Sequence, residues 1–336
     1  MDTALTGSVV DSALLARAQI VFTWESDFNG NNFMCHTTAG KKFIVSWGDG
    51  KSDTYTGKGE TEAWDNGYNA TDTALMFVMH TYNYSGTYTV SIVPDDTSCH
   101  FAELNVANSA VSLLDVGKAK FLRRLTCGIN SLTQLDVNQN TALERLDCHA
   151  CQLLALDVSR NAELEFLECG GNAFAHLDVS RNAALVSLDC RANQIATLDV
   201  THNAYLTQLE CSHNQLSALD VSHNPELRTF SCNNNQLTSL DVSQNPKLSV
   251  LSCNGNQLSA LDVSQNPNLD FVNCASNQLF AAALDSLFAN LPTPPAPDPD
   301  NEHYEEPTIS IGNNPGAQDC KLSVAIGKGW RFTDYE

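Results

Sequence analysis

Cysteine recurs at a fixed interval, and thiols can form disulfides or bind metal. Eight of the twelve cysteines lie 21 residues apart: Cys127, Cys148, Cys169, Cys190, Cys211, Cys232, Cys253 and Cys274. On stacked parallel strands, neighbouring side chains point the same way about 4.8 Å apart, whereas a disulfide requires Cβ atoms roughly 3.5–4.5 Å apart. We therefore expect eight free thiols that pack as small apolar groups and bind no metal. The sequence leaves open whether Cys35 and Cys99 are joined.

A column of carboxylates has the same spacing. The aspartate of a recurring LDV triplet occupies Asp115, Asp136, Asp157, Asp178, Asp199, Asp220, Asp241 and Asp262. Stacked carboxylates repel one another unless they are compensated, either by backbone amides and the following Ser or Thr, or by cations between them. Uniformity favours the first, structural interpretation, because a ligand site usually needs variety.

A second acidic column precedes the cysteines. The residue before each cysteine should point outward, and it is acidic in four consecutive repeats: Asp147, Glu168, Asp189 and Glu210. Arg145, Phe166, Arg191 and Gln208 are predicted to border this strip. Arg and aromatic side chains anchor many protein interfaces, so these eight residues are the predicted ligand-binding set, and a basic protein is the expected partner. The alternative is ordinary variation among solvated positions of degenerate repeats.

Catalytic motifs are not evident. The sequence has no nucleophile elbow, no Gly-rich phosphate loop, no H-E-x-x-H and no acid–base pair at a recognisable spacing. The histidines His149, His202, His213 and His223 should not converge on one site. We expect no enzyme activity, no cofactor and no metal centre.

The unit that positions these columns reads LDVSQNPKLSVLSCNGNQLSA, Leu240 to Ala260. Both halves follow L-x-x-L-x-[CV]-x-x-N, and the two-residue spacing of Leu251/Cys253 and Leu261/Val263 is strand periodicity. We expect short parallel strands on both sides of each coil and no convex helix. The Asn that ends each half should hydrogen-bond the backbone of its own and the next coil. One such ladder comprises Asn172, Asn193, Asn214, Asn235, Asn256 and Asn277.

Eight copies at this period, with L-x-x-L-x-L-x-x-N/C-x-L spacing, are the leucine-rich-repeat signature. The chain resembles bacterial leucine-rich-repeat surface proteins, with the 21-residue nested repeats called IRREKO, of Bacteroidetes or internalin type. The resemblance implies a mainly β, right-handed solenoid over residues 99–279, made of one degenerate and eight regular repeats. It also implies a surface or secreted protein of adhesin-like function.

The chain flanking the repeats is predicted to form two further parts. After residues 1–17, alternating apolar runs with the motifs WGDG, HTY and GTYTVSI make residues 18–98 resemble a PKD domain, an immunoglobulin-like β-sandwich. Residues 280–336 are expected to cap the solenoid. Leu284, Leu287, Phe288 and Leu291 have helical spacing, and a Pro- and acid-rich loop and a strand should follow.

Composition restricts the partners. The 336 residues carry a formal charge of −21, which would repel nucleic acid and anionic lipid. No run approaches the roughly 18 apolar residues of a membrane span, and no signal peptide is visible. We expect a monomer on the cell surface or outside the cell, with a cytoplasmic location left open. A glycan ligand and a purely structural stalk are the alternatives to protein binding.

Overall fold

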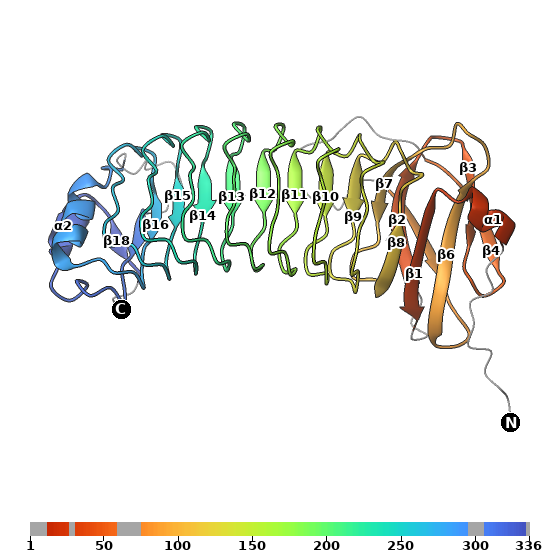
Figure 1. The fold of residues 1–336 in the computed structure, drawn as a ribbon, viewed down its shortest axis with the longest axis horizontal. Helices are drawn as coiled ribbons and strands as arrows, with labels where there is room; N and C mark the ends of the chain where they lie inside the picture. The colour runs from red at the N-terminus through yellow and green to blue at the C-terminus, as the bar shows by residue number, and fades with distance from the viewer. Residues whose placement is uncertain (1–11, 27–30, 59–74, 295–305, 334–336) are drawn as a thin grey trace, which may run out of the picture. The chain divides into compact units, whose positions relative to one another are not determined.

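The computed structural model describes residues 12–26, 31–58, 75–294 and 306–333. The chain divides into two compact units, Met1–Ala173 and Phe174–Glu336, which we describe separately. Figure 1 shows their elements in chain order.

The first unit begins with a short helix followed by two antiparallel groups of strands. The elements are α1 (Ser12–Arg17), β1 (Ile20–Ser26), β2 (Asn31–Thr37), β3 (Lys42–Ser46), β4 (Ser52–Thr56), β5 (Met76–His80), β6 (Gly86–Pro94), β7 (Phe101–Asn105) and β8 (Val111–Asp115). One sheet has the order β4-β3-β6-β1-β8, and in the other group β2 lies between β7 and β5. Their apolar residues alternate with exposed ones because successive side chains of a strand point to opposite faces.

An aromatic cluster fills the core of this region. The Trp24 indole N–H donates to the Tyr82 hydroxyl at 3.0 Å, and that hydroxyl donates to the Trp47 carbonyl at 2.8 Å. Asp49, in the WGDG turn, lies 2.9 Å from Nε2 of His80. The motifs that suggested a PKD domain thus contact one another, while the family assignment itself stays a prediction. The poorly matching stretch of residues 59–74 lies outside the described residues.

The degenerate repeat connects these strands to the solenoid. β7 pairs antiparallel with β2 and parallel with β9 (Arg124–Thr126), so that Leu104 lies opposite Cys35 and Leu125. β8 pairs with β1. The degenerate repeat therefore pairs antiparallel with the N-terminal strands and parallel with the first regular strand, β9. It covers the apolar end that a solenoid would otherwise leave open.

The repeats form a β-solenoid of stacked coils, as expected. Each coil contributes one three-residue strand to a parallel, in-register ladder, and the central apolar residue of each strand is buried. The first unit holds β9, β10 (Arg145–Asp147) and β11 (Phe166–Glu168). The second holds β12 (Ser187–Asp189), β13 (Gln208–Glu210), β14 (Thr229–Ser231), β15 (Val250–Ser252) and β16 (Phe271–Asn273).

In the regular repeats, the strand expected on the opposite side of each coil is not formed. Their LDV segments have neither strand nor helix structure, and a turn follows each of them. The backbone there bonds locally: the Val200 carbonyl accepts from Asn203 N–H at 3.0 Å, and Asp199 accepts from Thr201 N–H at 2.9 Å. The two halves share a sequence pattern, but in the LDV half these local bonds are formed where a strand ladder was expected. Coil-to-coil backbone bonds occur at the start of that half, as where Gln215 N–H donates to the Ile195 carbonyl at 2.9 Å.

The prediction that the ladder thiols are buried and form no disulfides is confirmed. All eight ladder cysteines are buried and free, and so are Cys35 and Cys99. Burial raises the pKa of most ladder thiols, that of Cys253 to about 12, and it raises the pKa of Cys99 to about 11. A buried protonated thiol is a poor nucleophile, so these cysteines pack as small apolar groups.

Asparagine amides join successive coils in a ladder, as predicted, although each reaches the preceding coil and not the next one. Asn235 Nδ2 donates to the carbonyls of Cys232 in its own coil and Cys211 in the preceding one, at 3.0 and 3.1 Å, and its Oδ1 accepts from Leu216 N–H at 3.0 Å. The Asn of the LDV half forms a second ladder, in which Asn224 donates to Val200 and Asn203 carbonyls. Each ladder satisfies carbonyls that the turn would otherwise bury without a partner.

The C-terminal cap contains more repeat structure than expected. After α2 (Ala281–Asn290), β17 (Thr308–Ser310) pairs in register with β16, and Asn314 continues the Asn ladder to the Cys274 carbonyl at 2.9 Å. The segment LSVAIG forms a helix, α3 (Leu322–Gly327), before β18 (Arg331–Phe332). Most of the Pro- and acid-rich loop lies outside the described residues, and no described helix could cross a membrane.

Replacing Cys211 with Ala should lower the free energy of unfolding by about 1 kcal/mol, less than the ~2–5 kcal/mol expected for Leu209→Ala, because a thiol leaves a smaller cavity. Equilibrium urea unfolding measures both. A larger loss for the cysteine variant would contradict its role as a space-filling group.

Thiol labelling should separate the ladder from the cap. A maleimide should modify Cys320, which is partly exposed, in the native protein, and the ladder thiols only after denaturation. Mass spectrometry of the labelled peptides counts them. Rapid native labelling of several ladder cysteines would be incompatible with the packing described above.

Candidate functional site

Three predicted ligand-binding residues meet on the strand face of the first unit. Arg145 begins β10, and Phe166 and Glu168 lie on the neighbouring β11, where Phe166 is the register partner of Arg145. The Arg145 guanidinium lies over the Phe166 ring, 5.4 Å from its centre, and its Nη2 donates to Glu168 Oε1 at 2.5 Å. All three side chains are partly exposed. We call Arg145, Phe166 and Glu168 the Arg–Phe–Glu cluster.

The outward strip expected in front of the cysteines is less uniform than the sequence suggested. Asp147 should have been solvated, but its side chain is only 4% exposed. Its Oδ1 accepts the backbone N–H of His149 at 3.1 Å, so the carboxylate turns inward to close a turn at the end of β10. A carboxylate two residues before a turn amide commonly makes this bond, and the bond competes with an outward orientation.

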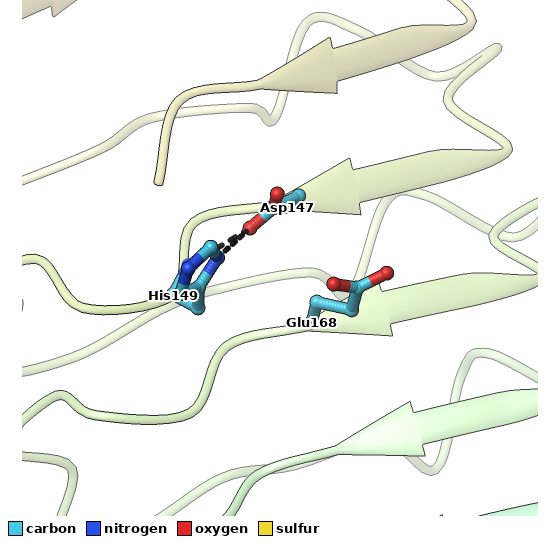
Figure 2. A group of neighbouring side chains, drawn as sticks. All are labelled: Asp147, His149 and Glu168. Carbon is cyan, nitrogen blue, oxygen red and sulfur yellow. Dashed lines mark hydrogen bonds and ion pairs between the residues drawn. The ribbon is translucent and has the colours of Figure 1, made fainter. Parts of the chain in front are cut away.

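His149 joins this group, which the sequence did not predict. Its Nδ1 lies 2.6 Å from Asp147 Oδ1, and Glu168 approaches from the adjacent strand. Figure 2 shows the imidazole facing the Asp147 carboxylate beyond the end of β10, with Glu168 beside them on the next coil. One ligand atom from each residue lies within 4.8 Å of the others. His202 and His223 occupy the same position in neighbouring coils, whereas His149 converges with two acids.

The second unit holds the remaining predicted residues. Asp189 accepts the backbone N–H of Arg191 at 3.1 Å, and its other oxygen lies 3.3 Å from Arg191 Nε. Gln208 accepts from the Ser187 hydroxyl at 3.3 Å, and Glu210 accepts Ser212 N–H at 3.0 Å. Each acid of the predicted strip in this unit therefore also caps a local turn. Arg191 is the most exposed of the predicted cations.

The LDV aspartates have the structural role that their uniformity favoured. They are exposed, and each described one from Asp115 to Asp262 accepts the backbone N–H two residues later at 2.9 Å. Hydrogen bonds from Thr201 and its serine counterparts lower the pKa of Asp157, Asp178, Asp199, Asp220 and Asp241. The carboxylate charge of this column is thus stabilised by local donors.

Comparison with known proteins supports the fold. The structure is similar to the functional domain of InlJ from Listeria monocytogenes, with 31% identity over 66% of this chain, 50% of that chain and a TM-score of 0.55. That domain is described as including a cysteine ladder. The chain spans half the length of this relative. It is also similar to internalin C2 of the same organism, at 19% identity over 56% of this chain and 78% of the other, with a TM-score of 0.45.

A chain in the octameric complex of Latrophilin 3, Unc5D and FLRT2, in which FLRT2 is the leucine-rich-repeat component, shares the fold at 19% identity. The match covers 63% of this chain and 69% of that chain, with a TM-score of 0.50. No family model matches the sequence, and neither does any curated protein. The fold is that of a leucine-rich-repeat solenoid of internalin type.

Removing an LDV carboxylate should lower stability in a pH-dependent way. The folded-state pKa of Asp199 is depressed, so its stabilisation is present above the unfolded pKa of ~3.9 and is lost as pH falls through the folded pKa. Asp199→Ala should therefore lower the thermal midpoint at pH 7 and lose less stability than wild type on acidification.

Asp199→Asn is the matched control, because an amide oxygen still accepts Thr201 N–H. It should destabilise less than Ala at pH 7. Equal midpoints for wild type and both variants from pH 3 to 7 would show that the column contributes no stability.

Proposed function

We propose that this chain is a non-enzymatic module that binds a protein through the strand face of its solenoid, in an adhesin-like role at the cell surface or outside the cell. The Arg–Phe–Glu cluster is the observation that carries the proposal. Arg and aromatic side chains are enriched among residues that dominate interface energies, and here they are preorganised against each other.

The arrangement of this cluster suits a protein ligand. The ion pair with Glu168 and the contact with Phe166 fix the long Arg145 side chain, so little of its rotamer entropy remains to be lost on binding. Arg145 and Phe166 are contributed by adjacent strands, β10 and β11, whose backbones pair in register. A partner would therefore meet a rigid, partly apolar surface with a charged edge.

Charge favours a basic partner. The chain carries a formal charge of −21, and four acids but only two arginines lie on the strands from β9 to β16. Arg145 offsets the charge of Glu168, and Arg191 offsets that of Asp189. Such a surface increases the association rate of a cationic protein more than it slows dissociation. We expect the chain to act as a monomer.

A glycan ligand is less well supported. Sugar recognition would be expected to use exposed stacked aromatic rings, whereas Phe166 and Phe271 are half-buried and lie in separate units. Tyr205 is 65% exposed but belongs to a turn outside the strand ladder. A purely structural stalk would not require the fixed orientation of Arg145 against Phe166 and Glu168.

Twelve free cysteines are compatible with an oxidising compartment. The ladder thiols are buried, and burial raises the pKa of thiols such as that of Cys211, so the reactive thiolate is scarce. Their free state is therefore no argument against an extracellular location.

Phe166→Ala should weaken binding by at least ten-fold, because a hot-spot side chain typically contributes about 2 kcal/mol. The assay is surface plasmon resonance with the immobilised chain, first against secreted and surface protein fractions and then against the purified ligand. Phe271→Ala is the matched control, since it removes a half-buried Phe from the same repeat position in a different coil. If both variants bind like wild type, the Arg–Phe–Glu cluster is not the binding site.

Glu168→Gln and Asp189→Asn should slow association with a basic ligand more than they speed dissociation, and added salt should reduce the wild-type association rate. Asp241→Asn, in the LDV column, should leave both rates unchanged. Should Asp241→Asn abolish binding while Glu168→Gln and Asp189→Asn have no effect, the ligand binds the other face.

A further inference from the structure

The group of Asp147, His149 and Glu168 goes beyond the protein-binding surface. It combines one imidazole and two carboxylates, and one ligand atom from each lies within 4.8 Å of the others. Donor atoms around a four-coordinate Zn²⁺ lie roughly 3.3–3.6 Å apart, given metal–ligand distances of about 2.0–2.2 Å. Small side-chain rotations that open the 2.6 Å contact between His149 Nδ1 and Asp147 Oδ1 would therefore bring all three donors to one ion.

The surrounding coils make room for the imidazole. At the position after each ladder cysteine, His149 is flanked by Gly128 in the preceding coil and Gly170 in the following one, whereas the later coils carry Arg, Ser, Asn, Asn and Ala. A Cβ added to Gly128 would lie 2.5 Å from His149 Nδ1 and 2.9 Å from Asp147 Oδ1. The backbone of Gly128 is not in the left-handed region, so its missing side chain serves this close approach.

The three side chains of Asp147, His149 and Glu168 differ in their exposure to solvent. The Asp147 side chain is 4% exposed, while those of His149 and Glu168 are 38% and 36% exposed. The aspartate is held on the inner side by its bond from His149 N–H, and the other two donors remain accessible from solvent. An ion could therefore reach the site from outside and find one fixed, desolvated carboxylate.

The neighbouring ion pair leaves a ligand position on Glu168. Arg145 Nη2 contacts Oε1 of this carboxylate, and a carboxylate has about four lone-pair sites on its two oxygens. Arg145 also offsets part of the negative charge before an ion arrives. Cys148, between Asp147 and His149 in sequence, is buried in the core and is not a ligand.

From this geometry we propose that Asp147, His149 and Glu168 bind one divalent transition-metal ion, with Zn²⁺ as the expected ion. Imidazole together with carboxylate suits Zn²⁺ and its neighbours, whereas Ca²⁺ and Mg²⁺ prefer all-oxygen sites. Three protein ligands leave at least one coordination position for water or for a side chain of another molecule. This proposal replaces the expectation, drawn from the sequence, of no metal centre. It does not depend on the protein-binding function, because all three metal ligands belong to this chain and no partner protein is needed for the ion to bind.

The test is calorimetric titration of the full chain, stripped with chelator, with Zn²⁺. Wild type should bind one ion in a phase that His149→Gln and Glu168→Gln each weaken at least ten-fold. Gly128→Ala keeps all three ligands but displaces the imidazole, and it should weaken the same phase. His213→Gln, an exposed histidine of another coil, and Gly117→Ala, a glycine away from the site, are the matched controls and should bind like wild type.

Thermal unfolding of each variant verifies that it is folded. Co²⁺ bound in place of Zn²⁺ should show visible absorption typical of nitrogen and oxygen ligands, without a thiolate charge-transfer band. The proposal is overturned if wild type binds no stoichiometric Zn²⁺, if His149→Gln binds as tightly as wild type, or if a thiolate band appears. Equal binding of Ca²⁺ that is insensitive to His149→Gln would reduce the site to a non-specific acidic surface.

Discussion

The stacking of identical 21-residue coils is the constraint from which the other features follow. A polypeptide that turns back every few residues must bury backbone carbonyls inside its turns, and those groups need partners. Here asparagine amides supply the partners, each bridging a carbonyl of its own coil and one of the preceding coil. The bond can form only when neighbouring coils stay in register, so the same interaction that satisfies a turn also fixes the spacing of the ladder.

The register between neighbouring coils determines which positions of the repeat can vary in sequence. Leu, Cys, Val and Asn occupy positions where each side chain meets its counterpart in the next coil, and a change there disturbs both neighbours. Outward positions on the strands have no such restriction within the core. The Arg–Phe–Glu cluster lies at these positions and His149 lies in the turn just beyond β10, which explains why chemistry appears where the repeat is least regular. Binding surfaces of repeat proteins commonly arise in this way, on a rigid scaffold with variable exposed residues.

Local turn chemistry limits how far a simple column of charges can act as a surface. Asp147, Asp189 and Glu210 each accept a backbone N–H two residues later. This bond places part of each carboxylate at the turn and withdraws Asp147 from solvent. A residue in this column is therefore both a turn cap and a candidate contact. Which of these two roles dominates depends on the residue after the cysteine. His149 contacts the Asp147 carboxylate and Arg191 pairs with Asp189, whereas Gly128 leaves space beside the next coil.

Periodicity in the sequence was sufficient to predict the solenoid, the buried free thiols, the Asn ladders and the turn role of the LDV aspartates, because each depends on short-range geometry repeated in every coil. It could not predict that only one half of the repeat forms strands, since both halves share a pattern and differ in how their backbone bonds are distributed. It did not predict that the expected cap strand, β17, would continue the solenoid ladder, or that Asp147, His149 and Glu168 would converge. Those depend on contacts between residues about twenty positions or more apart, where the gap left by Gly128 and the inward turn of Asp147 are decided by packing between coils.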